Sequence, residues 1–230
     1  MRLLLLLSAL GVACLASRLE ARDTTRVIEP RQVLFASQDG GTVHGDLYGS
    51  GKRGLVLAHG GRRTKEHWRP QVPAFVAAGF RVLAFDFRGV GQSTAGARGQ
   101  DATHLDVLAA VDYLRREGAT TVAVIGGSFG GVSAAAATVA APDAINRLVL
   151  LGATPEPPAE RLVTRTLYIA TREDANAAGL RLPGLQAHVA NAPQPKELIV
   201  LPGSAHAQFM FESEHGPRVM REILRFLADH

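Results

Sequence analysis

The sequence contains six short, mostly apolar runs, which cover residues 54–58, 81–85, 121–125, 147–151, 166–170 and 197–201. Runs of this length are typical of strands that are buried on both faces of a sheet. Segments with helical spacing separate most of them, as where Leu105, Leu108 and Val111 recur at every third position. Such repeated β-α units predict an α/β fold, with a mostly parallel sheet and helices on both of its faces.

Capping and breaking residues predict where the helices begin and end. We expect one helix over residues 70–78, closed by Gly79, and a second helix that Asp101 caps and Gly118 ends. An alanine-rich helix follows the third apolar run, and Pro217 opens a last helix near the end of the chain. Four helices are therefore expected around the sheet.

Near the start of the chain, residues 33–36 and 42–48 flank Asp39-Gly40-Gly41, a sequence that favours a tight hairpin. The hairpin brings the expected sheet to about eight strands. Ligands of such sheets bind at the carboxyl ends of the parallel strands. The chemistry of this chain is therefore expected in the loops that directly follow the apolar runs.

The first residues have the layout of a secretory signal peptide. Arg2 precedes an apolar stretch that ends in small residues, and this stretch is too short for a comfortable membrane span. We expect a signal peptide over residues 1–16, a linker over 17–30 and one domain over 31–230. The protein is then exported to a periplasm or secreted, without stable membrane insertion after cleavage. Lipid attachment through Cys14 is the alternative.

The composition and charge limit the classes of partner that this chain is expected to bind. Hydrophobic residues make up 47 % of the 230 residues, which is typical of a globular protein with a substantial core. The formal charge is +4, and the basic residues are scattered along the chain rather than gathered with aromatic residues. A nucleic-acid surface shows a concentrated basic footprint. We therefore expect no nucleic-acid partner.

Gly126-Gly127-Ser128-Phe129-Gly130 directly follows the third apolar run. A serine hydroxyl is a weak nucleophile, and it reacts only where a base can reach it. A sharp strand-to-helix turn exposes the hydroxyl, and the turn needs small residues beside the serine. The pattern and its position between a strand and a helix predict that Ser128 is a nucleophile.

His59-Gly60-Gly61 follows the first run, where an oxyanion hole can form because glycine lets a backbone N–H point into the site. We expect the N–H groups of Gly61 and Phe129 to bind an oxyanion, with Arg62 in reserve for the first of them. His59 is expected to be structural and to hold this loop through hydrogen bonds.

An acid and a base are expected after the last two runs. Asp174 can accept the Nδ1–H of a catalytic histidine, although Glu173 is its neighbour and Glu156 lies in the preceding loop. His206 follows the final run, and histidine is the natural general base near neutral pH. The predicted base is therefore His206, with Asp174 as its acid and Glu173 or Glu156 as alternatives.

Other polar and large residues near the expected site are explained by local pairing or core packing as well as by a role in the site. Asp86 follows the second run, and we expect it to pair locally with Arg88 rather than to act in catalysis. Trp68 and Met210 either border the site or lie in the core. The short segment over residues 152–158 leaves no room for a helical cap, so an open and shallow site is expected.

These motifs resemble the α/β-hydrolase superfamily, and within it the small lidless esterases that are similar to dienelactone hydrolase. The likeness covers nearly all of the mature chain. It implies the order nucleophile, acid, base, which matches Ser128, Asp174 and His206. Dienelactone hydrolases themselves use a cysteine as nucleophile, so the serine here points to the hydrolysis of esters instead.

The expected function is therefore that of a serine hydrolase that cleaves small carboxylic esters through an acyl-enzyme, without a metal or an organic cofactor. The same groups serve a thioesterase, a peptidase or an acyltransferase. A binding protein without catalytic activity, built on a hydrolase scaffold, is the alternative from another class.

Overall fold

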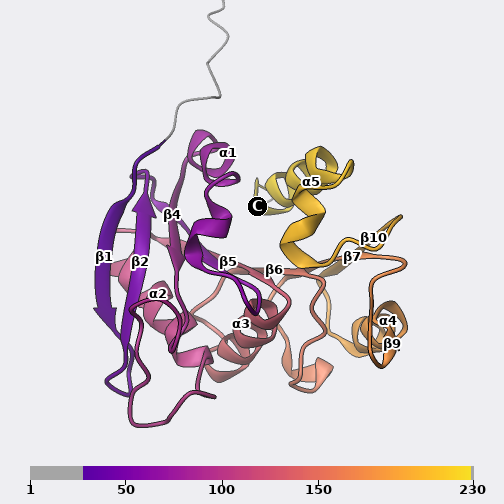
Figure 1. The fold of residues 1–230 in the computed structure, drawn as a ribbon, viewed down its shortest axis with the longest axis horizontal. Helices are drawn as coiled ribbons and strands as arrows, with labels where there is room; N and C mark the ends of the chain where they lie inside the picture. Colours follow the sequence, from indigo (N-terminus) through magenta and orange to yellow (C-terminus); the bar gives the residue numbers. More distant parts are fainter. Residues whose placement is uncertain (1–27, 229–230) are drawn as a thin grey trace, which may run out of the picture.

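An eight-stranded sheet runs through the middle of the molecule and carries helices on both faces (Figure 1). The computed structural model describes residues 28–228. The strands of this sheet are β1 (Arg31–Ala36), β2 (Thr42–Tyr48), β3 (Arg53–Ala58), β4 (Phe80–Phe85), β5 (Thr121–Gly127), β6 (Arg147–Leu151), β7 (Thr166–Thr171) and β10 (Lys196–Leu201). The helices are α1 (Val72–Ala77), α2 (His104–Arg116), α3 (Phe129–Ala140), α4 (Leu182–Asn191) and α5 (Gly216–Ala228).

The strands are ordered β1-β2-β4-β3-β5-β6-β7-β10. β1 and β2 form the expected hairpin, β2 runs antiparallel to β4, and all later pairs are parallel. The mostly parallel sheet of eight strands is thereby confirmed. Because β3 lies between β4 and β5, the loops that follow β3 and β5 leave the sheet side by side. Ligand sites of α/β sheets form at this kind of switch point.

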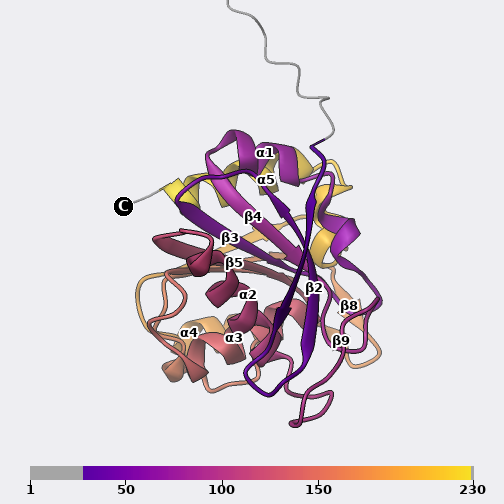
Figure 2. The ribbon, with the colours of Figure 1, turned by 90° about the vertical axis from the view of Figure 1, so that its left-hand side faces the viewer.

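Two apolar cores fill the spaces between the sheet and its helices. α2, α3 and α4 cover one face, and α1 and α5 cover the other, as Figures 1 and 2 show from two directions. Trp68 and Met210 are completely buried in the core under α1 and α5. Of the two interpretations of these residues, the core interpretation is therefore correct.

The start of one helix differs from the prediction, and a further helix and a small hairpin are new. α2 begins at His104 after Thr103, so Asp101 does not cap it. The Thr103 hydroxyl lies 2.8 Å from the Ser133 hydroxyl of α3, and this contact ties the start of α2 to its neighbour. α4 and the small hairpin of β8 (Ala175–Asn176) and β9 (Gly179–Leu180) were not predicted at all.

The connection between β6 and β7 holds only the short 3-10 helix η2 (Ala159–Arg161), and no separate cap domain covers the sheet within residues 28–228. Two further 3-10 helices, η1 (Lys65–Trp68) and η3 (Ala207–Phe211), follow β3 and β10. In the described part of the chain, no helix has both the length and the apolar character that a membrane crossing requires. The predicted signal peptide lies outside that part.

Arg88 is buried, but its partners are not the predicted one. Its guanidinium donates to Asp106 at 2.7 Å and to Asp39 at 3.0 Å. Asp86 instead accepts the backbone N–H of Lys65 at 2.8 Å. The predicted pair of Asp86 with Arg88 is wrong, because the turn after β4 directs the arginine toward α2 and the β1–β2 hairpin.

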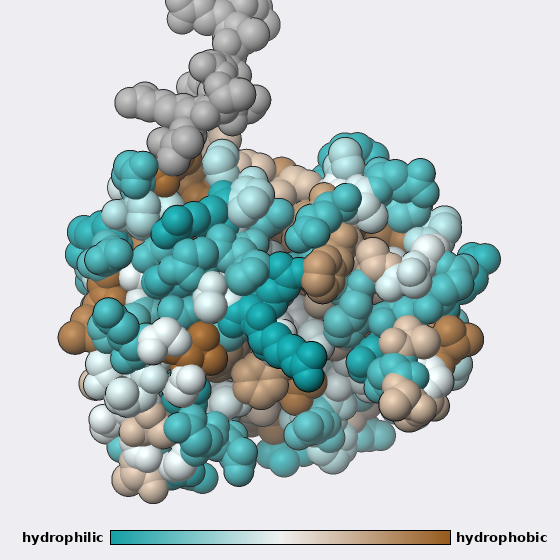
Figure 3. Space-filling model, in the orientation of Figure 1, coloured by the Kyte–Doolittle hydropathy of each residue, from teal (hydrophilic) through white to brown (hydrophobic). Residues whose placement is uncertain are grey.

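Polar side chains cover most of the face that Figure 3 shows, and apolar ones form small scattered patches. Five large hydrophobic side chains of the described residues are well exposed: Leu34, Phe129, Val163, Leu180 and Phe209. Single exposed apolar residues are ordinary on a soluble surface. Phe129 and Phe209 differ from the others because both line one cavity, which is described below.

Candidate active site

Ser128 occupies the sharp turn between β5 and α3. Its backbone angles, φ 48° and ψ −115°, are ones that a residue with a side chain rarely adopts. The flanking glycines make this turn sterically possible. A Cβ at Gly126 would lie 2.5 Å from the Gly130 carbonyl oxygen, and one at Gly130 would lie 2.4 Å from that of Ala58. The glycines therefore let the turn pack closely enough to present the serine at the edge of the sheet.

His206 lies between Ser128 and Asp174. Its Nδ1 is 2.6 Å from Asp174 Oδ2, and its Nε2 is 2.8 Å from Ser128 Oγ. An ionised carboxylate can only accept a hydrogen bond, so Nδ1 carries the proton and Nε2 accepts from the serine hydroxyl. The three loops after β5, β7 and β10 thus bring the three predicted side chains into one hydrogen-bonded series.

The acidic alternatives lie elsewhere. Glu173 is exposed, and its backbone N–H donates to the Gly203 carbonyl. Glu156 is exposed as well, and it lines a different cavity next to α2 and α3. Of the three acidic candidates, only Asp174 contacts the imidazole of His206 within residues 28–228.

Arg181 is a second partner of Asp174 that the sequence did not indicate. Its Nε lies 3.4 Å from Asp174 Oδ1, and its backbone N–H donates to the Asp174 carbonyl at 2.9 Å. Arg181 comes just before α4, an element without a clear pattern in the sequence. No spacing or motif could have singled it out.

The two predicted oxyanion donors lie next to each other. A Cβ added to Gly61 would be 3.8 Å from Phe129 Cβ, so the loop after β3 borders the start of α3. Among the described residues, neither the N–H of Gly61 nor that of Phe129 has a hydrogen-bond partner. Both donors therefore remain available beside Ser128. Arg62, the reserve donor, follows with a φ of 60°.

Hydrogen bonds hold the Gly60-Gly61 loop in place. His59 Nδ1 donates to the Gly60 carbonyl at 2.8 Å, and His59 Nε2 accepts the Phe87 N–H at 3.3 Å. Burial lowers the pKa of His59, which favours this neutral form. The predicted structural role of His59 is confirmed. Gln208, which was not predicted, accepts the Gly60 N–H through its Oε1 at 2.9 Å.

The His206 loop has its own constraints, which the predictions also missed. Gly152 follows β6 with a φ of 57°, and a Cβ there would lie 3.0 Å from His206 Nδ1. Ala207 has a φ of 51°, in the left-handed region that favours glycine. Gly152 carried a usable signal, because it directly follows the predicted strand over residues 147–151, as Gly126 follows the predicted strand over residues 121–125.

A cavity of about 210 Å³ opens beside Ser128 and His206. Phe129 and Phe209 contribute apolar walls and are 42 % and 50 % exposed. Arg62 and Arg63 also line it. Trp68 and Met210 do not border this cavity. Without a cap domain, the cavity faces solvent directly.

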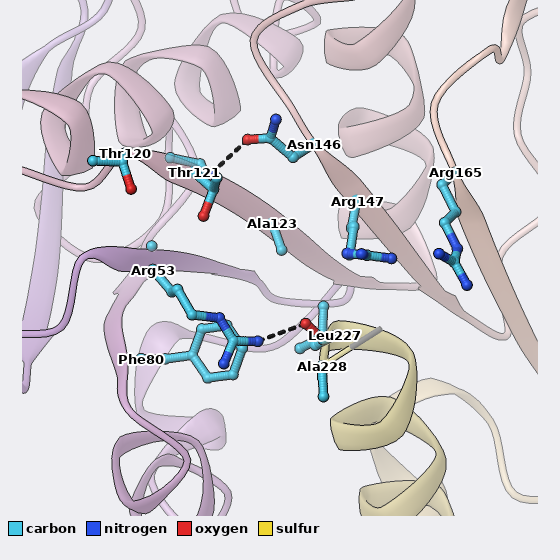
Figure 4. A pocket seen from close by; sticks show the side chains of 12 residues that line it. Arg53, Phe80, Thr120, Thr121, Ala123, Asn146, Arg147, Arg165, Leu227 and Ala228 are labelled. Carbon is cyan, nitrogen blue, oxygen red and sulfur yellow. Dashed lines mark hydrogen bonds between the residues drawn. The ribbon is translucent and has the colours of Figure 1, made fainter. Parts of the chain in front are cut away.

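A larger cavity, about 840 Å³, lies at the opposite edge of the sheet, where β3, β5 and β6 begin. Figure 4 shows Arg53, Arg147 and Arg165 around it, with Arg53 over the ring of Phe80 and bonded to the Leu227 carbonyl. It shares no lining residue with the Ser128 cavity. In residues 28–228, no cluster of three or more His, Cys, Asp and Glu side chains is placed to hold a metal ion.

The chain is similar to known proteins over its central half. The family model described as alpha/beta hydrolase fold matches residues 55–169, which are half of the chain. The match begins in β3 and ends in β7, and it includes the Ser128 turn.

Two curated relatives resemble parts of the chain. A 2-hydroxy-6-oxononadienedioate/2-hydroxy-6-oxononatrienedioate hydrolase of Paraburkholderia phymatum is 33 % identical over 120 residues, 50 % of this chain and 42 % of that protein. A bifunctional esterase/perhydrolase of Acinetobacter calcoaceticus is 39 % identical over 104 residues, 44 % of this chain and 37 % of that protein. The matches thus span about two fifths of the length of these relatives.

Solved structures match over more of the chain. An esterase from Pyrococcus furiosus superposes with a TM-score of 0.73 at 18 % identity, covering 87 % of this chain and 90 % of its own. An esterase from Exiguobacterium antarcticum gives 0.72 at 16 % identity, covering 86 % and 100 %. At these identities the likeness establishes the fold alone.

Proposed function

Because the chain belongs to the α/β-hydrolase family, we propose that it is a serine esterase that cleaves small carboxylic esters through an acyl-enzyme. The observation that carries the proposal is the series from Asp174 through His206 to Ser128, with distances of 2.6 Å and 2.8 Å. A purely structural role would not require a strained backbone at Ser128, nor two neighbouring backbone N–H groups, those of Gly61 and Phe129, that have no partner within residues 28–228.

In the first half-reaction, Ser128 Oγ attacks the carbonyl carbon of the ester while His206 Nε2 takes the hydroxyl proton. Asp174 accepts the Nδ1–H and stabilises the positive imidazolium. The N–H groups of Gly61 and Phe129 donate to the developing oxyanion. His206 then gives its proton to the leaving alcohol, and the acyl group stays on the serine.

In the second half-reaction, a water molecule replaces the alcohol. His206 takes a proton from the water, whose oxygen attacks the acyl carbon, and Ser128 leaves as a hydroxyl when it regains the proton. Removing one oxyanion donor typically lowers the rate by about 10²–10³-fold. The cavity of about 210 Å³, open to solvent, suits esters with a small acyl or alcohol group.

We also propose the finer relationship to the lidless esterases that are similar to dienelactone hydrolase. The short β6–β7 connection and the absence of a cap domain in residues 28–228 support it. The serine at position 128 is the point of departure, since dienelactone hydrolases use cysteine there.

Replacement of Ser128 tests the function. Ser128→Ala should lower kcat for 4-nitrophenyl acetate by at least about 10³-fold, because the nucleophile is gone while the cavity stays. Ser204→Ala is the control, since Ser204 is exposed and lies two residues before His206. Its kcat should stay within about twofold of the parent value. Turnover by the Ser128→Ala protein at the parent rate would remove Ser128 from the mechanism.

A further inference from the structure

The cavity beside Ser128 has an unbalanced charge. Ten residues line it, and among them are Arg62 and Arg63 but no aspartate or glutamate. Asp174 is on the far side of His206, and its side chain is only 4 % exposed. The walls of the cavity therefore include two arginines and no acidic residue.

The ring of Phe209 holds the Arg63 side chain in place, and N–H donors of its guanidinium remain available to a ligand. Its guanidinium lies 4.0 Å from the centre of the Phe209 ring, and its side chain is only 17 % exposed. Its one ion pair within residues 28–228 is long, with 3.9 Å between Nη2 and Oε1 of Glu212, whose side chain is 63 % exposed. The planar guanidinium offers five N–H donors in a fork that matches carboxylates.

Arg62 is exposed and lines the cavity, and its backbone φ of 60° is unusual for a residue with a long side chain. Arg88, in contrast, is completely buried and bonded to two carboxylates. Of these arginines, only Arg62 and Arg63 face the cavity where substrate would sit, and they do so next to each other in the chain.

Two apolar walls accompany the positive charge. Phe129 and Phe209 are among the few large hydrophobic side chains that are exposed in the described part of the chain, and both line this cavity. Exposed apolar surface beside convergent polar groups marks a ligand site. The walls suit the apolar body of a ligand, and the arginines suit an anionic group on it.

We propose that the natural substrate is an ester that carries a negative charge, a carboxylate on its acyl or alcohol part, which Arg62 and Arg63 bind while Phe129 and Phe209 hold the apolar body. This inference rests on the proposed esterase function, and it adds the charge of the substrate. The two arginines are specificity-determining residues, and they do not take part in the bond changes.

Matched ester pairs test the proposal. One pair is mono-4-nitrophenyl adipate and its methyl ester, where the charge is on the acyl part. The other is 4-acetoxybenzoate and its methyl ester, where the charge is on the alcohol part. The ratio of kcat/KM for the charged and the neutral member is the readout. Because hydrogen bonds to charged groups are strong, we expect a ratio of about 10 or more in at least one pair.

The double variant Arg62→Gln/Arg63→Gln should bring that ratio to about 1, and 0.5 M KCl should reduce it in the parent protein by screening. Arg116→Gln, at an exposed position on α2 that does not line the cavity, is the control and should keep the ratio. Circular dichroism and the melting temperature check that each variant is folded.

The outcomes separate the two levels of the account. Hydrolysis of both neutral esters, with no preference for the charged members and no change in the double variant, would overturn the charge proposal and leave the esterase function standing. Hydrolysis of no ester by the parent protein, neutral or charged, would overturn the proposed function itself. A ratio that falls in the double variant and stays at the parent value in Arg116→Gln supports the assignment to Arg62 and Arg63.

Discussion

At the scale of single residues, the acid of the proposed mechanism is the side chain with the most defined surroundings. Asp174 is buried, and its two carboxylate oxygens face different partners, His206 at 2.6 Å and Arg181 at 3.4 Å. Glu173 points into solvent one residue away. The carboxylate that contacts the imidazole is therefore held from two sides, while that of Glu173 is exposed to solvent.

Asp174→Asn should lower kcat by about 10⁴-fold, because an amide no longer keeps the proton on His206 Nδ1 and stops compensating the imidazolium charge. Glu173→Gln is the matched control, with the same chemical change at the next position, and should alter kcat by less than about twofold. Steady-state kinetics with 4-nitrophenyl acetate measure both. Equal losses in the two variants would contradict the assignment of the acid.

Residues that follow a strong local pattern could be predicted from the sequence. Ser128 and His206 each follow an apolar run, and the glycines around the serine are needed by the turn itself. Arg181 and Gln208 could not be predicted, because their partners come from elsewhere in the chain. The prediction that Asp86 pairs with Arg88 was wrong for the same reason, since the partners of Arg88 are 49 and 18 residues away in the sequence.

At the scale of elements, the site depends on how closely α3 approaches the end of β3. A Cβ at Gly130 would lie 2.4 Å from the Ala58 carbonyl oxygen and 2.5 Å from that of His59. Both contacts are with backbone atoms, which cannot rotate away as a side chain can. Any side chain at this position would therefore push the serine turn away from the Gly60-Gly61 loop.

Gly130→Ala should lower the free energy of unfolding by about 2 kcal/mol or more and reduce kcat/KM, because the clash separates α3 from β3. Gly184→Ala in α4 is the control. Gly184 is exposed, and a Cβ there would meet nothing within 4 Å. Gly184→Ala should raise the free energy of unfolding by about 0.5–1 kcal/mol, because alanine is more favourable than glycine inside helices. Urea unfolding curves decide between the outcomes, and a neutral Gly130→Ala would contradict the packing argument.

The strands could be predicted with nearly correct ends, because uniform apolar runs bounded by polar residues mark buried parallel strands. The run over residues 121–125 is observed as β5, which extends to Gly127. The helix α4 could not be predicted from the sequence, because Pro183 and Gly184 lie in its first turn. Proline is tolerated there since the first N–H groups of a helix have no partner within it, but sequence rules count both residues as helix breakers.

At the scale of the whole molecule, Arg88 joins three distant segments. It bonds to Asp39 in the β1–β2 hairpin, to Asp106 in α2 and to the Gly99 carbonyl between them. The hydrogen bond from Arg88, together with that from Ser37, holds the pKa of Asp39 well below its usual range. The network thus fixes the hairpin against the rest of the domain.

Asp39→Asn should lower the free energy of unfolding at pH 7 by about 2 kcal/mol, the size of a hydrogen bond between charged groups. The folded pKa of Asp39 is depressed, so its contribution is complete above the unfolded pKa of about 3.9 and is lost as the pH falls below it. The difference between parent and variant should therefore shrink below about pH 4. Asp143→Asn, at an exposed position, is the control and should show a small difference without that trend.

The family and a mostly parallel sheet of about eight strands could be predicted from the sequence, because strands, turns and motifs follow one another along the chain in a characteristic order. The spatial order of the strands could not be predicted. The absence of a cap domain among the described residues could be predicted from the short connection after β6. The signal peptide over residues 1–16 and export stay predictions, because those residues lie outside the part that the structure describes.

The most direct test of the central claim is covalent labelling by a fluorophosphonate, read by intact mass and peptide mapping. The probe reacts with a serine only when a base activates its hydroxyl. One label per chain, located on Ser128 and lost in both Ser128→Ala and His206→Ala, is the predicted result. An active parent protein that carries the label on another residue, or that labels equally well without the His206 imidazole, would contradict the account.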